Sequence, residues 1–367
     1  MAGRAASEAI DLGGIQGLSI NQENPSGNPP TIPKEANSYT YSTLAASINI
    51  GLSILETPAG RQTLRAIGRE VVRLWQDNGS HVFGGDVRQM GAYVDHFLAR
   101  VRSDFPLVFV MRCNLDTIAY AQRIPGNVLW DGRLDSYLPK GAGSLNFNHH
   151  GVAAMTETAS QASSPHMRRR FHSYLFKFSV ATAHELVHLF TSYLAQGSDS
   201  DGSYTPPQLS HLNYGRREGN AVMGESGRWF ENSLFGGSLE FYRDPNDDGN
   251  QAGVAYLLDG EAVARRVHDS CIQDIAANEN LSANFPFRTT GSRYTHQDRR
   301  NRNLQSLGST QGAPAPPAGA LLMTALRDRG SLHLYNIPGS QLRRISQAPG
   351  RLTNFTEARY TSRVRVR

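Results

Sequence analysis

One stretch of the chain, residues 164–197, constrains the fold more than any other. It opens with Ser164-Pro165, a pair suited to the N-cap and the first turn of a helix. No Gly or Pro follows until Gly197, which is placed to end the helix. Between Phe176 and Leu194 most residues are apolar or small. The sequence therefore predicts one long helix that is buried on most of its sides.

Within this predicted helix lies the pattern His184-Glu185-Leu186-Val187-His188. Helix positions four apart share a face, so both imidazoles can address one ion, and Zn²⁺ accepts such nitrogen ligands. Glu185 lies beside that face and can take a proton from a water that the metal activates. The pattern predicts a catalytic zinc site with Glu185 as general base. The alternative is a buried helix whose histidines form only hydrogen bonds, but such polar groups are costly without partners.

This pattern resembles the active-site helix of the zincin metallopeptidases, and the resemblance implies a third protein ligand further along the chain. The metzincin branch would need a glycine three residues after His188 and a histidine six residues after it. Thr191 and Leu194 stand at those positions. The resemblance therefore excludes the metzincin branch and directs attention to a glutamate downstream.

The segment Gly224–Glu231 resembles the gluzincin pattern, in which the ligand Glu precedes small residues, an aromatic residue and a second acid. By this match Glu225 is the third zinc ligand. Ser226 and Gly227 are then the small residues that let a second helix lie close to the first.

Glu231 is the competing third ligand. It stands four residues before Phe235-Gly236-Gly237, and the clostridial neurotoxin light chains have a similar arrangement. Six residues apart, Glu225 and Glu231 cannot both face the metal from one straight helix. We therefore expect Glu225 to bind zinc and Glu231 to orient a histidine, with the reverse assignment left open.

The resemblance implies an α+β fold, mostly helical, with a small mixed sheet packed on the motif helix. Periodicity and composition predict helices and strands that agree with such a fold. The predicted helices are 42–56, 60–77, 86–103 and 259–278, and the predicted strands are 107–111, 117–122, 128–130 and 144–149. By resemblance, residues 144–150 would form the edge strand that pairs with an extended substrate.

The composition changes along the chain and predicts three regions. Residues 1–40 are rich in Gly, Asn, Pro and Ser and predict a loose N-terminal arm. Residues 41–285 would form the zincin-like catalytic domain. Residues 286–367 would be a C-terminal extension that includes a linker-like Ala/Pro/Gly run at 312–319.

The long polar loop 197–223 is expected to shape the cleft. A zincin needs a Tyr, His or Arg to stabilise the developing oxyanion. Tyr214 is our first candidate, followed by His211 and by Arg228, for which an ion pair with Glu231 is an equal alternative.

Two further polar segments admit a metal-binding interpretation. His149 and His150 are adjacent imidazoles, which we interpret as cleft-lining residues in preference to extra ligands. Asp244–Asn250 resembles the first half of a calcium loop, but the twelfth position is Ala255, so an Asp/Asn/Gly turn is the favoured interpretation.

The composition, 39% hydrophobic and 19% charged, indicates a globular chain. There is no apolar run near the ~20 residues of a membrane span. Because no apolar signal core is seen and Cys113 and Cys271 are too few for a disulfide framework, we expect a cytoplasmic protein. A net charge of +5 permits an acidic partner, but no nucleic-acid-binding module is present, so nucleic acid is not expected as a partner.

These features together predict a zinc-dependent hydrolase, with a metallopeptidase acting on a peptide or protein substrate as the first hypothesis. Two alternatives stay open: a zinc amide or lactone hydrolase acting on a small metabolite, and a non-catalytic, zinc-stabilised interaction protein. Glu185 argues for catalysis, because a structural zinc site closes its fourth position with another ligand and has no use for that carboxylate.

Overall fold

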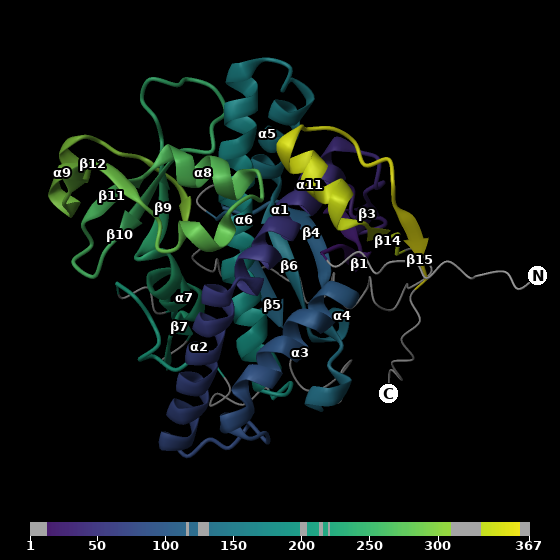
Figure 1. Ribbon diagram of the computed structural model, residues 1–367, viewed down its shortest axis with the longest axis vertical. Coiled ribbons are helices and arrows are strands. Elements are labelled where there is room, and N and C mark those ends of the chain that lie inside the picture. The colour runs from purple at the N-terminus through teal and green to yellow at the C-terminus, as the bar shows by residue number, and fades with distance from the viewer. Residues whose placement is uncertain are drawn as a thin grey trace, which may run out of the picture.

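The computed structural model describes residues 13–114, 117–123, 132–198, 204–212, 216–218, 221–309 and 332–359. Its fold is mixed α+β, as the sequence predicts. The long helix α6 (Pro165–Leu194) lies near the centre of the molecule in Figure 1, and several helices and one strand of the central sheet pack against it.

The other helices precede and follow α6 in the sequence. They are α1 (Tyr39–Glu56), α2 (Pro58–Asp77), α3 (Met90–Ser103), α4 (Pro139–Ala142), α5 (His149–Ser160), α7 (Ser226–Phe235), α8 (Asp269–Ala276), α9 (His296–Asn301) and α11 (Gly339–Gln347). The strands are β1 (Ile15–Leu18), β2 (Ile20–Glu23), β3 (Thr31–Pro33), β4 (Leu107–Met111), β5 (Ala119–Arg123), β6 (Gly143–Asn148), β7 (Arg216–Glu218), β8 (Ala221–Met223), β9 (Ser238–Tyr242), β10 (Val254–Leu258), β11 (Ala264–Val267), β12 (Thr289–Tyr294), β13 (Ser306–Ser309), β14 (Leu334–Ile337) and β15 (Thr356–Ala358).

The central sheet has the strand order β3-β2-β4-β6-β5. Strands β2, β4 and β6 run parallel, whereas β3 and β5 pair antiparallel at the two edges. Every residue of β4 is buried, which explains its continuous apolar sequence. Helix α6 packs along β5 and against α1 and α5, so its apolar surface is buried on several sides.

The close approach of α1 to α6 depends on Gly51. A Cβ atom at that position would lie 2.6 Å from the Cβ atom of Thr182 and 2.8 Å from the carbonyl oxygen of Ser179. Any larger side chain would push the two helices apart. The small residues of both helices therefore fix the position of the helix that carries the histidine motif.

The predicted edge strand is wrong. Strand β6 lies between β4 and β5, and it is β5 that forms the edge. The chain leaves β6 at Asn148, whose side chain caps α5 by accepting a hydrogen bond from the amide of His150 (3.0 Å). His149 and His150 therefore begin a helix and do not extend the strand.

The loose arm predicted for residues 1–40 is wrong from residue 15 onward. Ile15, Leu18 and Ile20 are at most 1% exposed, β1 pairs with β14, and β2 pairs with β4. These strands are only four residues long and are surrounded by polar sequence, so the composition of the region does not indicate them. Strand β1 pairs with β14, and β11 pairs with β12. The domain boundaries expected at residues 40 and 285 would therefore divide strands that belong to the same sheet.

A second sheet, of order β12-β11-β10-β9-β13, covers another side of α6 (Figure 1). The helix predicted over 259–278 is correct only for α8, because 264–267 form β11. The reversal between β10 and β11 depends on Asp259, whose side chain accepts hydrogen bonds from the amides of Glu261 and Val263, and on Ala262 with φ +57°. The strand predicted at 128–130 lies outside the described residues.

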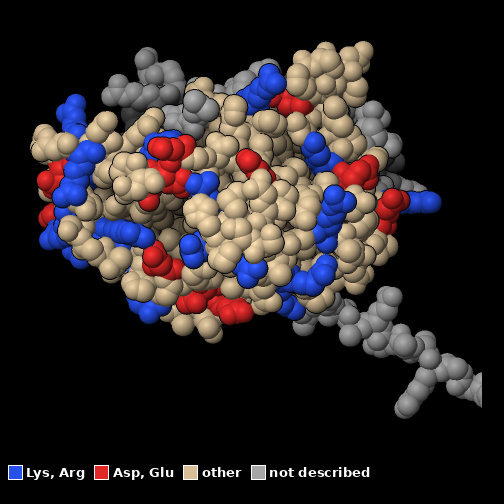
Figure 2. All heavy atoms as spheres, turned by 90° about the horizontal axis from the view of Figure 1, so that it is seen from above, with Lys and Arg blue, Asp and Glu red and all other residues tan. Residues whose placement is uncertain are grey.

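Two surface properties bear on partners. No helix in the described part of the chain is long and apolar enough to cross a membrane. Figure 2 shows Lys and Arg side chains interspersed with Asp and Glu on the face that it displays.

Candidate metal centre

The structure brings His184, His188 and Glu225 together at one point. The Oε1 atom of Glu225 lies 2.7 Å from Nε2 of His188 and 3.2 Å from Nε2 of His184. The two Nε2 atoms are themselves 3.3 Å apart. Among the described residues, this is the one group of at least three His, Cys, Asp or Glu side chains whose ligand atoms all lie within 4.8 Å of one another.

Glu225 reaches this point because it is the N-cap of α7. Its Oε2 atom accepts a hydrogen bond from the amide of Arg228 (2.6 Å), which satisfies one of the unpaired amides of the first helical turn. Its own amide donates to the carbonyl of Leu209 (2.7 Å). With one carboxylate oxygen used as the cap, the other is held facing the two imidazoles.

Glu231 lies behind the first histidine. Its Oε1 atom is 2.8 Å from Nδ1 of His184, while its Oε2 atom accepts hydrogen bonds from the amide of Leu239 (2.9 Å) and from Arg228 (3.0 Å). A proton on Nδ1 then leaves the lone pair of Nε2 for a ligand bond. The geometry therefore puts Glu225 with the two Nε2 atoms and Glu231 in the orienting position.

The second histidine is oriented in the same manner by a hydroxyl. The Oγ atom of Ser226 lies 3.0 Å from Nδ1 of His188. Both imidazoles thus have a partner at the far nitrogen, and their near nitrogens converge. Metal-binding histidines are held in this way in proteins generally.

The electrostatics of the cluster favour a cation. Burial opposes the charge on His184, but the carboxylates of Glu225 and Glu231 outweigh it and raise the pKa of His184 to about 10. Burial also opposes the charge on Glu225, yet His188 and His184 hold its pKa well below the usual value. In the absence of an ion, a proton on His184 supplies positive charge beside these buried carboxylates. A divalent ion can take that place.

Glu185 is buried next to the cluster. Its Oε2 atom accepts a hydrogen bond from the amide of Ala121 in β5 (2.6 Å). Its Oε1 atom is buried and has no hydrogen-bond partner among the described residues. Burial raises the pKa of Glu185 to about 7, against the opposing effect of the two histidines. A carboxyl group with a pKa near neutrality suits a proton carrier.

Gly227 allows the second helix to approach the first. A Cβ atom at this position would lie 2.3–2.4 Å from three ring atoms of His184. Two residues on different helices therefore share a space that holds only one side chain. The small residue expected here from the sequence is required by the imidazole itself.

We expect Gly227→Ala to displace the ring of His184 and to abolish tight zinc binding, because a contact of 2.3 Å cannot be accommodated without movement. The matched control is Gly260→Ala, since a Cβ atom at Gly260 meets nothing within 4 Å. Metal content after dialysis, measured by inductively coupled plasma mass spectrometry, checks this prediction. Zinc retained equally by both variants would contradict it.

The candidates for oxyanion stabilisation have different outcomes. Tyr214 lies outside the described residues. His211 has its Nδ1 atom 2.7 Å from the hydroxyl of Ser238. Arg228 is fully buried and donates to Glu231 and to the carbonyl of Leu239, which is the ion pair that the sequence allowed as the alternative. Arg228 therefore supports Glu231 and does not reach a substrate.

The other segments considered for metal binding are built differently. His149 and His150 lie at the start of α5, apart from the cluster. In the 244–250 segment, the Oδ1 atom of Asp244 accepts from the amide of Asn246 (2.9 Å), and Asp247 forms an ion pair with Arg170. This is the hydrogen-bonded turn that the sequence favours over a calcium loop.

Two contacts of the site were not anticipated from the sequence. The amide of Ala121 that holds Glu185 is a main-chain group, and no side-chain pattern indicates it. Ser226 was expected only as a small packing residue, although it also anchors His188. A hydroxyl one residue after a candidate ligand is the only signal that could have indicated this role.

Comparison with known proteins gives no assignment. No family model, no curated protein and no solved structure matches this chain. The function is therefore inferred from the site alone.

Proposed function

We propose that the protein is a zinc-dependent hydrolase of the zincin type and most specifically a metallopeptidase. His184, His188 and Glu225 would hold Zn²⁺, and Glu185 would act as general base. The observation that carries the proposal is the convergence of two Nε2 atoms and one carboxylate oxygen beside a buried carboxylate with an unpartnered oxygen. We propose, on the same basis, that the fold is zincin-like.

The donor set fits zinc better than other common ions. Two imidazole nitrogens and one carboxylate oxygen are typical ligands of catalytic Zn²⁺, which keeps a fourth position open. Magnesium and calcium prefer sets made wholly of oxygen ligands. The Nδ1 atoms of both histidines contact Glu231 and Ser226, which hold the two rings in orientation. The side chains would therefore lose little conformational freedom when the ion binds.

A bound Zn²⁺ would supply a Lewis acid that polarises the scissile carbonyl and lowers the pKa of a coordinated water. Glu185 would accept a proton at its Oε1 atom and later deliver it to the leaving amine. The hydrogen bond from the amide of Ala121 keeps Oε2 in place, so Oε1 is the oxygen that exchanges the proton.

Strand β5 would hold the substrate. It is the antiparallel edge of the central sheet, and the amide of Ala121 points toward Glu185 and away from β6. No other described strand pairs with the outer edge of β5, and this edge faces the proposed general base. An extended peptide that pairs with this edge would place a peptide bond near Glu185, and this favours a peptide over a small metabolite.

Digestion of a peptide library, read by mass spectrometry, tests the proposal. We expect one equivalent of zinc in the purified protein, cleavage that 1,10-phenanthroline abolishes, and recovery when Zn²⁺ is restored. Cleavage that persists without metal would contradict the proposal. If zinc is bound but no peptide is cut, panels of amide and lactone substrates would distinguish a small-molecule hydrolase from a non-catalytic protein.

A further inference from the structure

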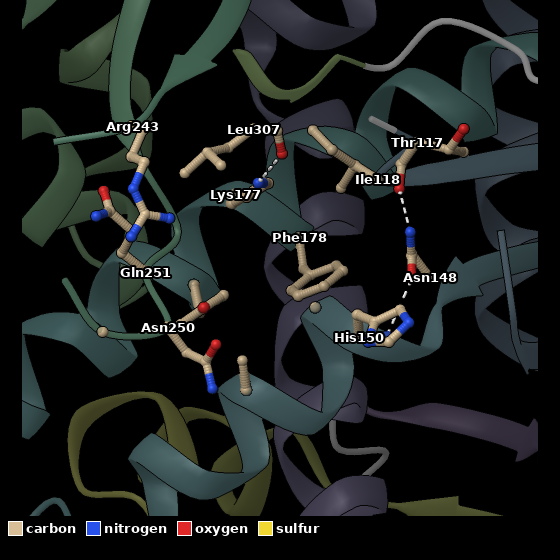
Figure 3. Close-up of a pocket in the computed structure, with 14 residues that line it drawn as sticks. Thr117, Ile118, Asn148, His150, Lys177, Phe178, Arg243, Asn250, Gln251 and Leu307 are labelled. Carbon is tan, nitrogen blue, oxygen red and sulfur yellow. Dashed lines mark hydrogen bonds between the residues drawn. The ribbon is translucent and has the colours of Figure 1, made fainter. Parts of the chain in front are cut away.

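A cavity of about 170 Å³ lies beside α6, away from the histidine cluster. Figure 3 shows Arg243, Gln251 and Asn250 along one side of it and Ile118, Asn148 and His150 along the other, with Lys177 and Phe178 between them. The walls come from α6, the residues before β5, the start of α5 and the segment between β9 and β10. None of these residues takes part in the proposed metal centre.

Lys177 is a buried cation at this cavity. It is 7% exposed, and its Nζ atom donates to the carbonyl oxygens of Ala252 (3.0 Å) and Leu307 (2.9 Å). No carboxylate forms an ion pair with it among the described residues. Burial lowers the pKa of Lys177 to about 7, and the ring of Phe241 lies on another side of Nζ, with its centroid 5.0 Å away. The charge therefore lacks a countercharge within the described protein.

The remaining polar groups of the cavity are also suited to an anion. None of the lining residues is an Asp or a Glu. Arg243 and His150 add basic groups, and Asn250 and Gln251 add amides. The guanidinium of Arg243 lies 3.4–3.5 Å from the main-chain carbonyls of Asp247 and Asp248, so these contacts leave its charge in place. Among the described residues this small cavity is lined by the basic side chains of Lys177 and Arg243 and by no carboxylate, which makes it complementary to a carboxylate.

The position of the cavity relates it to the proposed active site. Phe178 precedes Glu185 by seven residues on α6, which is two turns and about 10 Å on the same face. Ile118 is the residue before β5 and precedes Ala121 by three residues, which is also about 10 Å of extended chain. Both routes place the cavity about three residues of extended substrate from the catalytic carboxylate.

We propose that this pocket, with Lys177 and Arg243 as its cations, binds a carboxylate of the substrate about three residues from the cleaved bond. The subsite assignment rests on the proposed peptidase function, whereas binding of a carboxylate by the pocket does not. The carboxylate comes either from an acidic side chain or from the C-terminus of the peptide. Charge-assisted hydrogen bonds from Lys177 and Arg243 recognise both.

Binding is tested without cleavage in the full-length Glu185→Gln protein. The probes are three tripeptides: acetyl-Ala-Ala-Glu-amide, acetyl-Ala-Ala-Gln-amide and acetyl-Ala-Ala-Gln with a free C-terminus. We expect calorimetry to give at least one charged peptide a Kd about tenfold below that of the neutral peptide, because bonds to charged groups are the stronger ones. The charged peptide that binds more tightly identifies the source of the carboxylate. Equal binding of all three would overturn the proposal.

Lys177→Met and Arg243→Gln, each added to that protein, assign the effect to the pocket. Met preserves the volume of the side chain and removes a buried charge without a countercharge, so we expect the Lys177→Met variant to fold. Both variants should lose the preference for a charged peptide. Arg69→Gln, which removes an exposed cation on α2, is the matched control and should keep it. A preference that survives in both pocket variants would overturn the assignment.

The catalytic protein adds a second readout. In the peptide library we expect cleaved sequences to be enriched in a carboxylate about three residues from the cut. Lys177→Met should raise KM for such peptides about tenfold and leave kcat within about twofold, since the pocket contacts the substrate far from the reacting bond. Carboxylate binding without any cleavage would refute the peptidase function and leave the pocket standing. Cleavage without any preference for a carboxylate would support the peptidase function and refute the proposed role of the pocket.

Discussion

The Glu185→Gln protein is expected to bind zinc with nearly unchanged affinity and to lose about 10²–10⁴-fold in kcat. The amide keeps the size of the side chain and can still accept the hydrogen bond that Ala121 donates, but it cannot take up a proton at Oε1. Glu185 is not one of the three residues of the ligand group, so we expect the amide to leave those three side chains in place.

This result is measured as kcat for a library-derived peptide, with zinc content measured on the same preparation. Glu157→Gln is the matched control, because Glu157 is an exposed acid on the neighbouring helix α5 and should tolerate the change without loss. A Glu185→Gln protein that keeps full activity would show that another group moves the proton. A protein that loses zinc would show that Glu185 is a ligand.

The helices and strands that could be predicted from the sequence are those whose own residues carry the capping, periodicity or apolar pattern that defines them. Helix α6 has a Pro at its first position, no interrupting residue and a continuous apolar surface, and the structure forms it as predicted. Helix α1 and strand β4 likewise carry periodicity or an apolar run within their own residues. For such segments, burial and local propensity lead to the same structure, so the sequence alone is sufficient.

The errors concern relations between distant segments. Whether β5 or β6 forms the sheet edge depends on strand order, and both strands have similar short apolar patterns. Strand β1 is stable because it pairs with β14, more than 300 residues away, and nothing within residues 15–18 indicates that partner. Strand β11 lies in a segment with helical spacing, where sheet pairing overrides the local preference.

The site could be predicted further than the fold around it. Two histidines four apart share one face of a helix, and the expectation of Glu225 in preference to Glu231 comes from the resemblance to the gluzincin pattern, in which small residues follow the acid. In the structure Gly227 faces the ring of His184, and Glu225 is the N-cap of α7, the helix that contains Glu231. The unforeseen groups are a main-chain amide and the hydroxyl of Ser226, which have no sequence pattern.

Glu225→Ala and Glu231→Ala are expected to fail in different ways, and the difference decides which acid binds the ion. Glu225→Ala removes a ligand oxygen, so zinc should be lost on dialysis, and the metal-free protein should also lose stability because the helix cap and the buried partner of both histidines are removed. Glu231→Ala should weaken zinc binding by about 10–100-fold, because it removes the group that orients His184. It should also destabilise the metal-free protein by about 3–5 kcal/mol, because Glu231 is a fully buried partner of Arg228.

Thermal unfolding with and without added Zn²⁺ separates these two effects. An ion that binds only the folded state raises Tm in proportion to the logarithm of its concentration over Kd. The Tm of Glu225→Ala should therefore not rise with zinc. The Tm of Glu231→Ala should lie below that of the metal-free wild type and should still rise at higher zinc concentration. If instead Glu231→Ala shows no zinc response and Glu225→Ala keeps the full one, Glu231 is the ligand, and the close pair of Glu225 with His188 is only a hydrogen bond.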